Sequence, residues 1–236
     1  MTPDPIAALT LGVPAYFHPA AQPFDWQRLT EIPHRLRFVV MNVYNGAGAE
    51  PDPSYKAIVD ALIAAGVRII GYVDTDYGRR PIPEIAQEVA AYHRRYGIEG
   101  VFMDQVSPGL EKLEHYAQAV LAARTAKARF VVLNPGTHPH PGYLDLANVT
   151  VTFEGTWSQY VGLKVPTWVT RFPASRFCHL VHTVPDEEFG PGLALAADRH
   201  ARSVFLTDGR GENPWDHLPD QLLDAVRATT SQTAAR

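Results

Sequence analysis

The feature of this chain that most limits its fold is a regular alternation of apolar runs with segments of helical periodicity. The apolar runs are rich in β-branched residues and cover 11–18, 38–45, 68–75, 100–106, 129–136, 148–155, 177–184 and 203–209. Strands that are apolar along their whole length suit a sheet that is covered on both faces. Eight such units in 236 residues predict a closed (β/α)8 TIM barrel, with a single domain over residues 1–236.

Helical segments separate most of these runs, and some of them carry end signals. We expect Asp25 to cap a short helix over 26–32, and Ser54 to cap a helix that ends at Gly66. Further helices are expected over 82–97, 109–128, 186–201 and 218–229, with a short turn or helix over 141–147. The pattern assigns no structure to residues 164–173.

An open, doubly wound sheet is the alternative fold. Such a sheet usually has a glycine-rich phosphate loop after its first strand. This chain has YFHPAAQPFDW in that place, which cannot form such a loop. The short glycine-containing stretches GAG and GRGEN elsewhere are interpreted as turns. The closed barrel is therefore the favoured architecture, and we assign no nucleotide-binding site.

Composition narrows the classes of partner. The net charge is −4 and no run of lysine and arginine stands out, so nucleic acids and membrane surfaces are poor candidates. No stretch approaches the length of a membrane span. The single cysteine, Cys178, excludes an internal disulfide and lies in an apolar run, which is typical of a small buried residue. We expect a monomer.

Two strand ends carry acids that are difficult to explain structurally. Asp104 in VFMDQV and Glu154 in VTVTFEG each end an apolar strand, and glutamate is not a favoured turn residue. Active sites of (β/α)8 barrels form at the carboxyl ends of the strands. We therefore expect both carboxylates to line one pocket.

Other strand-end residues have ordinary structural explanations as well as functional ones. Asn134 in NPG and Asp208 in DG fit turns, and Asp74 can cap a helix or fix a loop. His18 and His182 are readily explained as hydrogen-bonded residues of the pocket wall. Both kinds of explanation stay open for these five positions.

Two carboxylates that face one cleft indicate cleavage of a glycosidic bond. One acid protonates the leaving oxygen, and the other attacks the anomeric carbon or activates water. Tyrosines and Trp157 offer flat faces to sugar rings, while asparagines and Arg79 can bind hydroxyl groups. The residues expected to bind substrate are Tyr16, His18, Asn42, Tyr72, Asp74, Tyr77, Arg79, Gln105, Asn134, Trp157, His182 and Asp208.

A metal-dependent hydrolase is the competing class. It would need paired histidines on the first strand, or a dense cluster of histidine and aspartate. The first strand has one histidine in YFHP, and His138 and His140 lie in a proline-rich loop with no acid beside them. We therefore expect no catalytic metal and no cofactor.

Six segments occur in a characteristic order: VPAYFHP, VVMNVYNGAG, AGVRIIGYVDTDYGRR, YGIEGVFMDQV, VVLNPGT and VTVTFEG. In these segments the chain resembles the spherulin-4 family, glycoside hydrolase family 135, well over residues 12–155 and weakly in the last third. The resemblance implies a (β/α)8 barrel that cleaves galactosaminogalactan-type polymers rich in α-1,4-linked N-acetylgalactosamine. It places the first acid of a family Asp–Glu pair at Asp104, and a further family glutamate at Glu154.

The chain departs from the family pattern at Gln105, where the family has the second acid of the pair. Glutamine can hydrogen-bond a sugar but cannot ionise or deliver a proton. Side chains alternate along a strand, so Asp104 and Gln105 cannot both point straight into the cleft. Two alternatives to a galactosaminogalactan hydrolase stay open: a barrel that binds carbohydrate without cleaving it, and a hydrolase of a different exopolysaccharide.

Our hypothesis assigns one role to each acid. Asp104 is the nucleophile, held by hydrogen bonds from Gln105 or Tyr72, and Glu154 is the acid/base, its pKa raised by apolar neighbours such as Trp157. The expected reaction is retaining, endo-acting cleavage of an α-linked amino-sugar polysaccharide or oligosaccharide. The carboxyl groups should then lie about 5–5.5 Å apart.

The cellular location is open at this stage. The N-terminal stretch MTPDPIAALTLGVPAYFHP lacks the basic start and the long apolar segment of a secretory signal. A polymer hydrolase should meet its substrate outside the cell. The protein is expected to be extracellular if a leader was removed, and cytoplasmic otherwise.

Overall fold

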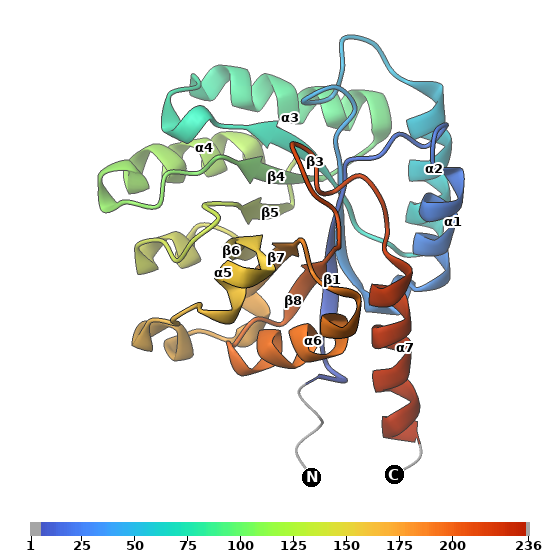
Figure 1. The fold of residues 1–236 in the computed structure, drawn as a ribbon. Helices are drawn as coiled ribbons and strands as arrows, with labels where there is room; N and C mark the ends of the chain where they lie inside the picture. The colour runs from blue at the N-terminus through green and yellow to red at the C-terminus, as the bar shows by residue number, and fades with distance from the viewer. Residues whose placement is uncertain (1–5, 235–236) are drawn as a thin grey trace.

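Eight parallel strands close into a barrel in the computed structural model, which describes residues 6–234 (Figure 1). Each strand pairs with the next along the chain, and the last pairs with the first. The strands are β1 (Thr10–Ala15), β2 (Leu36–Met41), β3 (Ile69–Asp74), β4 (Gly100–Asp104), β5 (Phe130–Leu133), β6 (Val149–Thr156), β7 (Phe177–His182) and β8 (Ser203–Leu206). The predicted TIM barrel is confirmed, and closure excludes the open sheet. Residues 1–5 and 235–236 of the predicted domain lie outside the described residues.

Helices form the outer layer around this barrel (Figure 1). They are α1 (Pro23–Glu31), α2 (Pro53–Ala64), α3 (Ile82–Tyr96), α4 (Leu113–Thr125), α5 (Trp157–Val161), α6 (Phe189–Asp198) and α7 (Asp220–Ala234). Short 3-10 turns lie between them, at Pro33–Arg35, Asp76–Gly78, Leu110–Lys112, Pro141–Asp145, Thr167–Arg171, Ala174–Arg176 and Asp186–Glu188. None of the described helices has the length and apolar character needed to cross a membrane.

Close packing between the strands and this outer layer depends on a glycine in β3. A β-carbon at Gly71 would lie 2.4 Å from the ring of Tyr92, a residue of α3. The Tyr92 hydroxyl in turn donates to the carbonyl of Met41 at 3.0 Å, and so satisfies a backbone acceptor at the end of β2. The missing side chain at Gly71 therefore lets α3 lie directly against the barrel.

Two predicted helix caps are wrong, because a proline begins each helix two or three residues before the expected start. Pro23 opens α1 after Gln22, and Asp25 lies inside the first turn instead of capping it. Asp52 caps α2, where its carboxylate accepts from the backbone N–H of Ser54 at 2.8 Å. The helix α2 ends before Gly66, which has a φ of +83°, as expected for a C-terminal glycine.

Residues 164–173, which the pattern left unassigned, contain the 3-10 turn Thr167–Arg171. Val169 of this turn is buried in a small second cluster with Leu144, Phe177 and Ala201. The short helix α5, immediately after β6, was not predicted. Its five residues are too few to show a helical period.

Candidate active site

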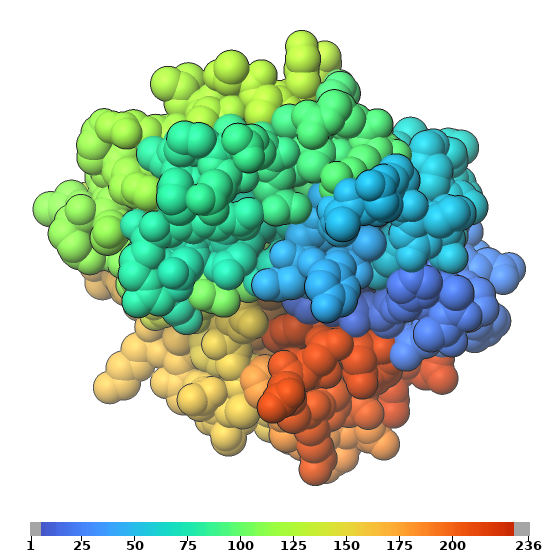
Figure 2. All heavy atoms as spheres, turned by 90° about the horizontal axis from the view of Figure 1, so that it is seen from above, coloured from blue at the N-terminus to red at the C-terminus, as the bar shows by residue number. Residues whose placement is uncertain are grey.

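A cavity of about 420 Å³ opens at the carboxyl ends of the strands. It is lined by Pro14, Tyr16, Asn42, Val43, Asn45, Tyr72, Phe102, Asp104, Asn134, Glu154, Leu180, Glu212, Asn213 and Trp215. Figure 2 shows the molecule from above relative to Figure 1, and the cavity lies at the carboxyl ends of the strands. This is the end of the barrel at which the sequence predicted a site.

Asp104 ends β4 and receives two side-chain hydrogen bonds from the neighbouring strands. The Tyr72 hydroxyl donates to Oδ2 at 3.0 Å, and the Asn134 amide donates to Oδ1 at 2.6 Å. Burial raises the pKa of Asp104, while these donors and the backbone N–H of Gln105 oppose the rise. The carboxylate is thus held in a fixed orientation by two polar partners.

Asn134 joins the two predicted acids. Its Oδ1 accepts from the backbone N–H of Gly136 at 3.0 Å, which turns its amide nitrogen toward the carboxylates. That nitrogen lies 2.6 Å from an oxygen of Asp104 and 2.5 Å from an oxygen of Glu154. The two bridged oxygens are therefore no more than about 5 Å apart.

Glu154 lies on β6, with a raised affinity for its proton. Burial, followed by the negative charge of Asp104, raises its pKa to about 7. Hydrogen bonds from Asn134 and from the Trp215 side chain oppose this rise. Two carboxylates in one cavity thus differ in environment, and Glu154 is the one with a pKa in the range suited to a general acid.

Two tyrosines form an aromatic wall of the cavity: Tyr72 lies on β3, and Tyr16 directly follows β1. The rings of Tyr16 and Tyr72 meet edge to face, with their centroids 5.5 Å apart. Burial, together with the nearby charges of Asp104 and Glu154, raises the pKa of Tyr16 well above its usual value, so this phenol stays neutral. Tyr16 therefore offers a neutral ring and hydroxyl beside the acids.

Three lining residues come from a segment in which the sequence indicated only a turn. Glu212, Asn213 and Trp215 belong to residues 207–219, which we call the β8–α7 arm. The Asn213 amide donates to the Tyr16 carbonyl at 3.0 Å, and the Tyr16 N–H donates to the Trp215 carbonyl at 3.2 Å. These bonds bring the arm against the end of β1, where orange-red and blue segments lie together in Figure 2.

The cavity brings together six predicted site residues: Tyr16, Asn42, Tyr72, Asp104, Asn134 and Glu154. Four others, from the first and third βα units, lie outside its lining. His18 hydrogen-bonds Asp52 at 3.0 Å, and Asp74 accepts from the backbone N–H of Asp76 at 2.6 Å. Arg79 is exposed and paired with Asp76, and Tyr77 is 54% exposed.

The remaining four predicted residues also lie outside the lining. Trp157 begins α5 and packs against Tyr160. His182 hydrogen-bonds Thr183 at 3.0 Å. Asp208 lies 2.8 Å from a ring nitrogen of His217.

Gln105 is the fourth of these residues, and its backbone explains its placement. Its φ is +52°, in the left-handed region. Its carbonyl accepts from the Tyr77 N–H at 2.8 Å and from the Thr75 hydroxyl at 2.9 Å. Of the two predicted donors to Asp104, Tyr72 is present, whereas Gln105 contributes its backbone N–H and not its amide.

No group of three or more histidine, cysteine, aspartate or glutamate side chains within residues 6–234 is arranged to hold a metal ion. The amide of Asn134 instead bridges Asp104 and Glu154. Asp104 also accepts from the Tyr72 hydroxyl, and Glu154 from the side chain of Trp215. These donors suit two carboxylates that act on a bound molecule directly.

Comparison with known proteins identifies the family. The model of the spherulation-specific family 4 (spherulin-4) matches residues 10–229. The chain belongs to this family. Spherulin-4 of Physarum polycephalum is 29% identical over 213 residues, which is 85% of this chain and 64% of that protein. This spherulin-4 family chain thus spans less than two thirds of the length of that curated relative.

Solved structures share the barrel. Sph3 of Aspergillus clavatus, solved in complex with GalNAc, has a TM-score of 0.80 and 24% identity, covering 94% of this chain and 97% of that chain. A chitinase of Chromobacterium violaceum has a TM-score of 0.59 and 10% identity, covering 94% and 99%. The fold of the spherulin-4 family chain is therefore shared along nearly its whole length.

Proposed function

We propose that this protein is a retaining glycoside hydrolase in which Asp104 is the nucleophile and Glu154 the acid/base. The observation that carries the proposal is the single amide nitrogen of Asn134, which lies within 2.6 Å of both carboxylates. Retaining enzymes have carboxyl groups about 5–5.5 Å apart, whereas inverting enzymes leave about 6.5–9.5 Å for a water molecule. The two bridged oxygens are at most about 5 Å apart, and this upper limit on their distance supports the retaining geometry.

The two steps use the different surroundings of the acids. In the first step, Asp104 attacks the anomeric carbon, and the bond to the leaving oxygen breaks as Glu154 donates its proton to that oxygen. In the second step, Glu154 takes a proton from water, whose oxygen attacks the anomeric carbon and releases Asp104. The Tyr72 and Asn134 hydrogen bonds orient Asp104, and the pKa of about 7 lets Glu154 carry a proton in neutral solution.

The substrate we propose is a polysaccharide of α-linked N-acetylgalactosamine and galactosamine, cleaved within the chain. Sph3, a structure with the same fold, was solved with GalNAc, and this supports an amino-sugar substrate. None of the described residues that line the cavity is lysine, arginine or histidine, while three are acids. This lining favours neutral or cationic sugars over uronic acids or sulfated sugars.

Gln105 is compatible with this activity. The acid that the family has at this position is replaced by an amide, but the side chain is not part of the cavity lining. The carbonyl of Gln105 instead supports the turn after β3. We propose that Asp104 and Glu154 suffice for the reaction.

Hydrolysis of partly deacetylated galactosaminogalactan tests the proposal. The protein and its Asp104→Asn variant are incubated with the polymer, and released oligosaccharides are measured by mass spectrometry. We expect release by the parent alone. Polymer binding without release by the parent would instead indicate a carbohydrate-binding barrel, and release by both proteins would remove Asp104 from the mechanism.

A further inference from the structure

The β8–α7 arm provides three of the lining residues, although it contains no strand or helix of its own. It begins after β8 and ends where α7 starts. Its Trp215 is only 5% exposed, hydrogen-bonds Glu154 and stacks edge to face on His182. The position of Trp215 therefore depends on whatever fixes the course of the arm.

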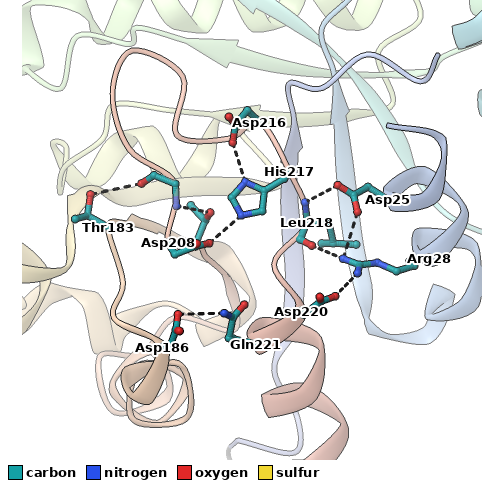
Figure 3. Close-up of polar contacts among 12 residues, drawn as sticks. Asp25, Arg28, Thr183, Asp186, Asp208, Asp216, His217, Leu218, Asp220 and Gln221 are labelled. Atoms are coloured by element: carbon teal, nitrogen blue, oxygen red, sulfur yellow. Dashed lines mark hydrogen bonds and ion pairs between the residues drawn. The ribbon is translucent and has the colours of Figure 1, made fainter. Parts of the chain in front are cut away.

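A histidine near the end of the arm joins its two ends. His217 lies with Nε2 at 2.8 Å from Asp208, the second residue of the arm, and with Nδ1 at 2.7 Å from Asp216 (Figure 3). Carboxylate oxygens accept but cannot donate, so only a protonated imidazole can donate to both of them. The contact between His217 and Asp208 closes a loop that contains Glu212, Asn213 and Trp215.

The chain beyond His217 is fixed to α1. The backbone N–H of Leu218 donates to Asp25 at 3.1 Å, and Arg28 donates to the Leu218 carbonyl (Figure 3). Arg28 also pairs with Asp25 and with Asp220, the first residue of α7. The end of the arm is thus fixed to the helical layer. The contact between His217 and Asp208 joins this fixed end to the start of the arm.

We propose that His217 is a positioning residue for the active site: paired with Asp208, it closes the β8–α7 arm and so holds Trp215 against Glu154. This inference rests on the function proposed above, since it explains how Glu154 is kept covered for acid catalysis. It also gives Asp208 a function other than substrate binding.

The charged groups around His217 give the contact a pH dependence. Partial burial disfavours its charged form, but the hydrogen bonds to Asp216 and Asp208 outweigh burial and raise its pKa. Beyond these two acids lie Arg28 with its two aspartates on α1 and α7, and Asp186 bonded to Gln221. The contact is fully present below the ordinary histidine pKa of about 6.5 and is lost as the pH rises through the raised value.

The test compares His217→Gln with His200→Gln, a matched control at the end of α6. The ring of His200 hydrogen-bonds the Phe172 carbonyl at 2.8 Å and is not part of the cavity lining. The emission of Trp215 is isolated by subtracting spectra of matched proteins that carry Trp215→Phe. Values of kcat and KM are measured on the polymer from pH 4.5 to 8.5, and Asp208→Asn is a second variant should His217→Gln fail to fold.

We expect the Trp215 emission of His217→Gln to shift to longer wavelength, and kcat/KM to fall about tenfold or more, mainly through kcat. The basic limb of its pH profile should move to lower pH, because uncovering Glu154 removes the burial that raises its pKa. Asp208→Asn should change in the same direction, and His200→Gln should match the parent.

Unchanged emission and an unchanged profile in both His217→Gln and Asp208→Asn would overturn the positioning function, even if the parent cleaves the polymer. A parent that cleaves nothing, with the emission shift present in the variants, would overturn the proposed hydrolase and leave the positioning of Trp215 standing. A uniform loss of rate without a shift of the pH profile or the emission would also contradict the proposal.

Discussion

The neighbouring strands β3 and β4 end alike in sequence and differ in the use of their final acid. Asp74 and Asp104 are partners in register, each at the end of a buried apolar strand. Asp104 receives side-chain donors from Tyr72 and Asn134 and lines the cavity. Asp74 accepts from the backbone N–H of Asp76, two residues further along the chain, and is not part of the lining.

The difference lies in the chain that follows each acid. After Asp74 the backbone turns at once, with Asp76 and Tyr77 both at positive φ, and the acid is used to hold this turn. After Asp104 only Gln105 is left-handed, and Val106 then bonds to the carbonyl of Asn134 at 3.0 Å. A strand-end acid is thus available for chemistry where neighbouring side chains bind its carboxylate, and not where the turn that follows it uses that carboxylate as an acceptor.

The largest effect should separate these two acids. Asp104→Asn should lower kcat/KM by about 10³-fold or more, because it removes the nucleophile. Asp74→Asn should lower it by less than about tenfold, because an amide oxygen can still accept from the N–H of Asp76. Both variants are assayed on the same polymer, with circular dichroism to check folding. Equal losses in the two variants would break the comparison.

Asn134→Ala should have the next largest effect. It removes a donor from both carboxylates, and each hydrogen bond to a charged group contributes about 1.5–3 kcal/mol. We expect kcat/KM to fall about 10- to 100-fold and the pKa of Glu154 to rise, since Asn134 lowers it. The matched control is Asn148→Ala, which removes a cap on the Val131 N–H at the start of β5 and should leave the rate per folded molecule unchanged.

The pH dependence of Glu154 gives a third prediction. The folded protein holds this proton with a pKa of about 7, against an ordinary value of 4.5, so the free energy of unfolding should fall as the pH rises from about 4.5 to about 7. The kcat/KM of the parent should fall above about pH 7 as the acid is lost. In Glu154→Gln the free energy of unfolding, measured with urea, should change less between about pH 4.5 and pH 7 than it does in the parent. A curve unchanged from the parent would contradict the raised pKa.

The smallest effect is expected at Gln105. Gln105→Glu restores the family acid, yet the side chain at this position is not part of the cavity lining. We expect kcat/KM to change by no more than about twofold, corresponding to about 0.5 kcal/mol. A gain of several hundredfold would show that the natural protein is catalytically impaired at this position.

The barrel could be predicted because each strand is apolar along its length and lies between helical segments. The same pattern placed Asp104, Glu154 and Asn134 at strand ends, where parallel strands converge in space. Their shared hydrogen bonds could not be predicted, because they depend on side-chain directions and on Gly136, which orients the amide of Asn134.

The β8–α7 arm could not be predicted, because its course has no periodicity. Trp215 reaches Glu154 only after β8 has closed against β1, a contact between the two ends of the chain. Conversely, Trp157 was a reasonable candidate from its position just after Glu154. The short helix α5 carries it to Tyr160 instead.

The most direct measurement of the central claim is azide rescue of Asp104→Ala and Glu154→Ala. Each variant is given azide and an activated aryl α-glycoside of a galactosamine oligosaccharide, and the anomeric configuration of the glycosyl azide is read by NMR. Azide that replaces Asp104 attacks the anomeric carbon once and inverts it, giving the β-azide. Azide that replaces water in the Glu154 variant attacks the Asp104 glycosyl-enzyme and gives the α-azide. The account predicts this pair of opposite products; the same anomer from both variants, or the reverse assignment, would contradict it.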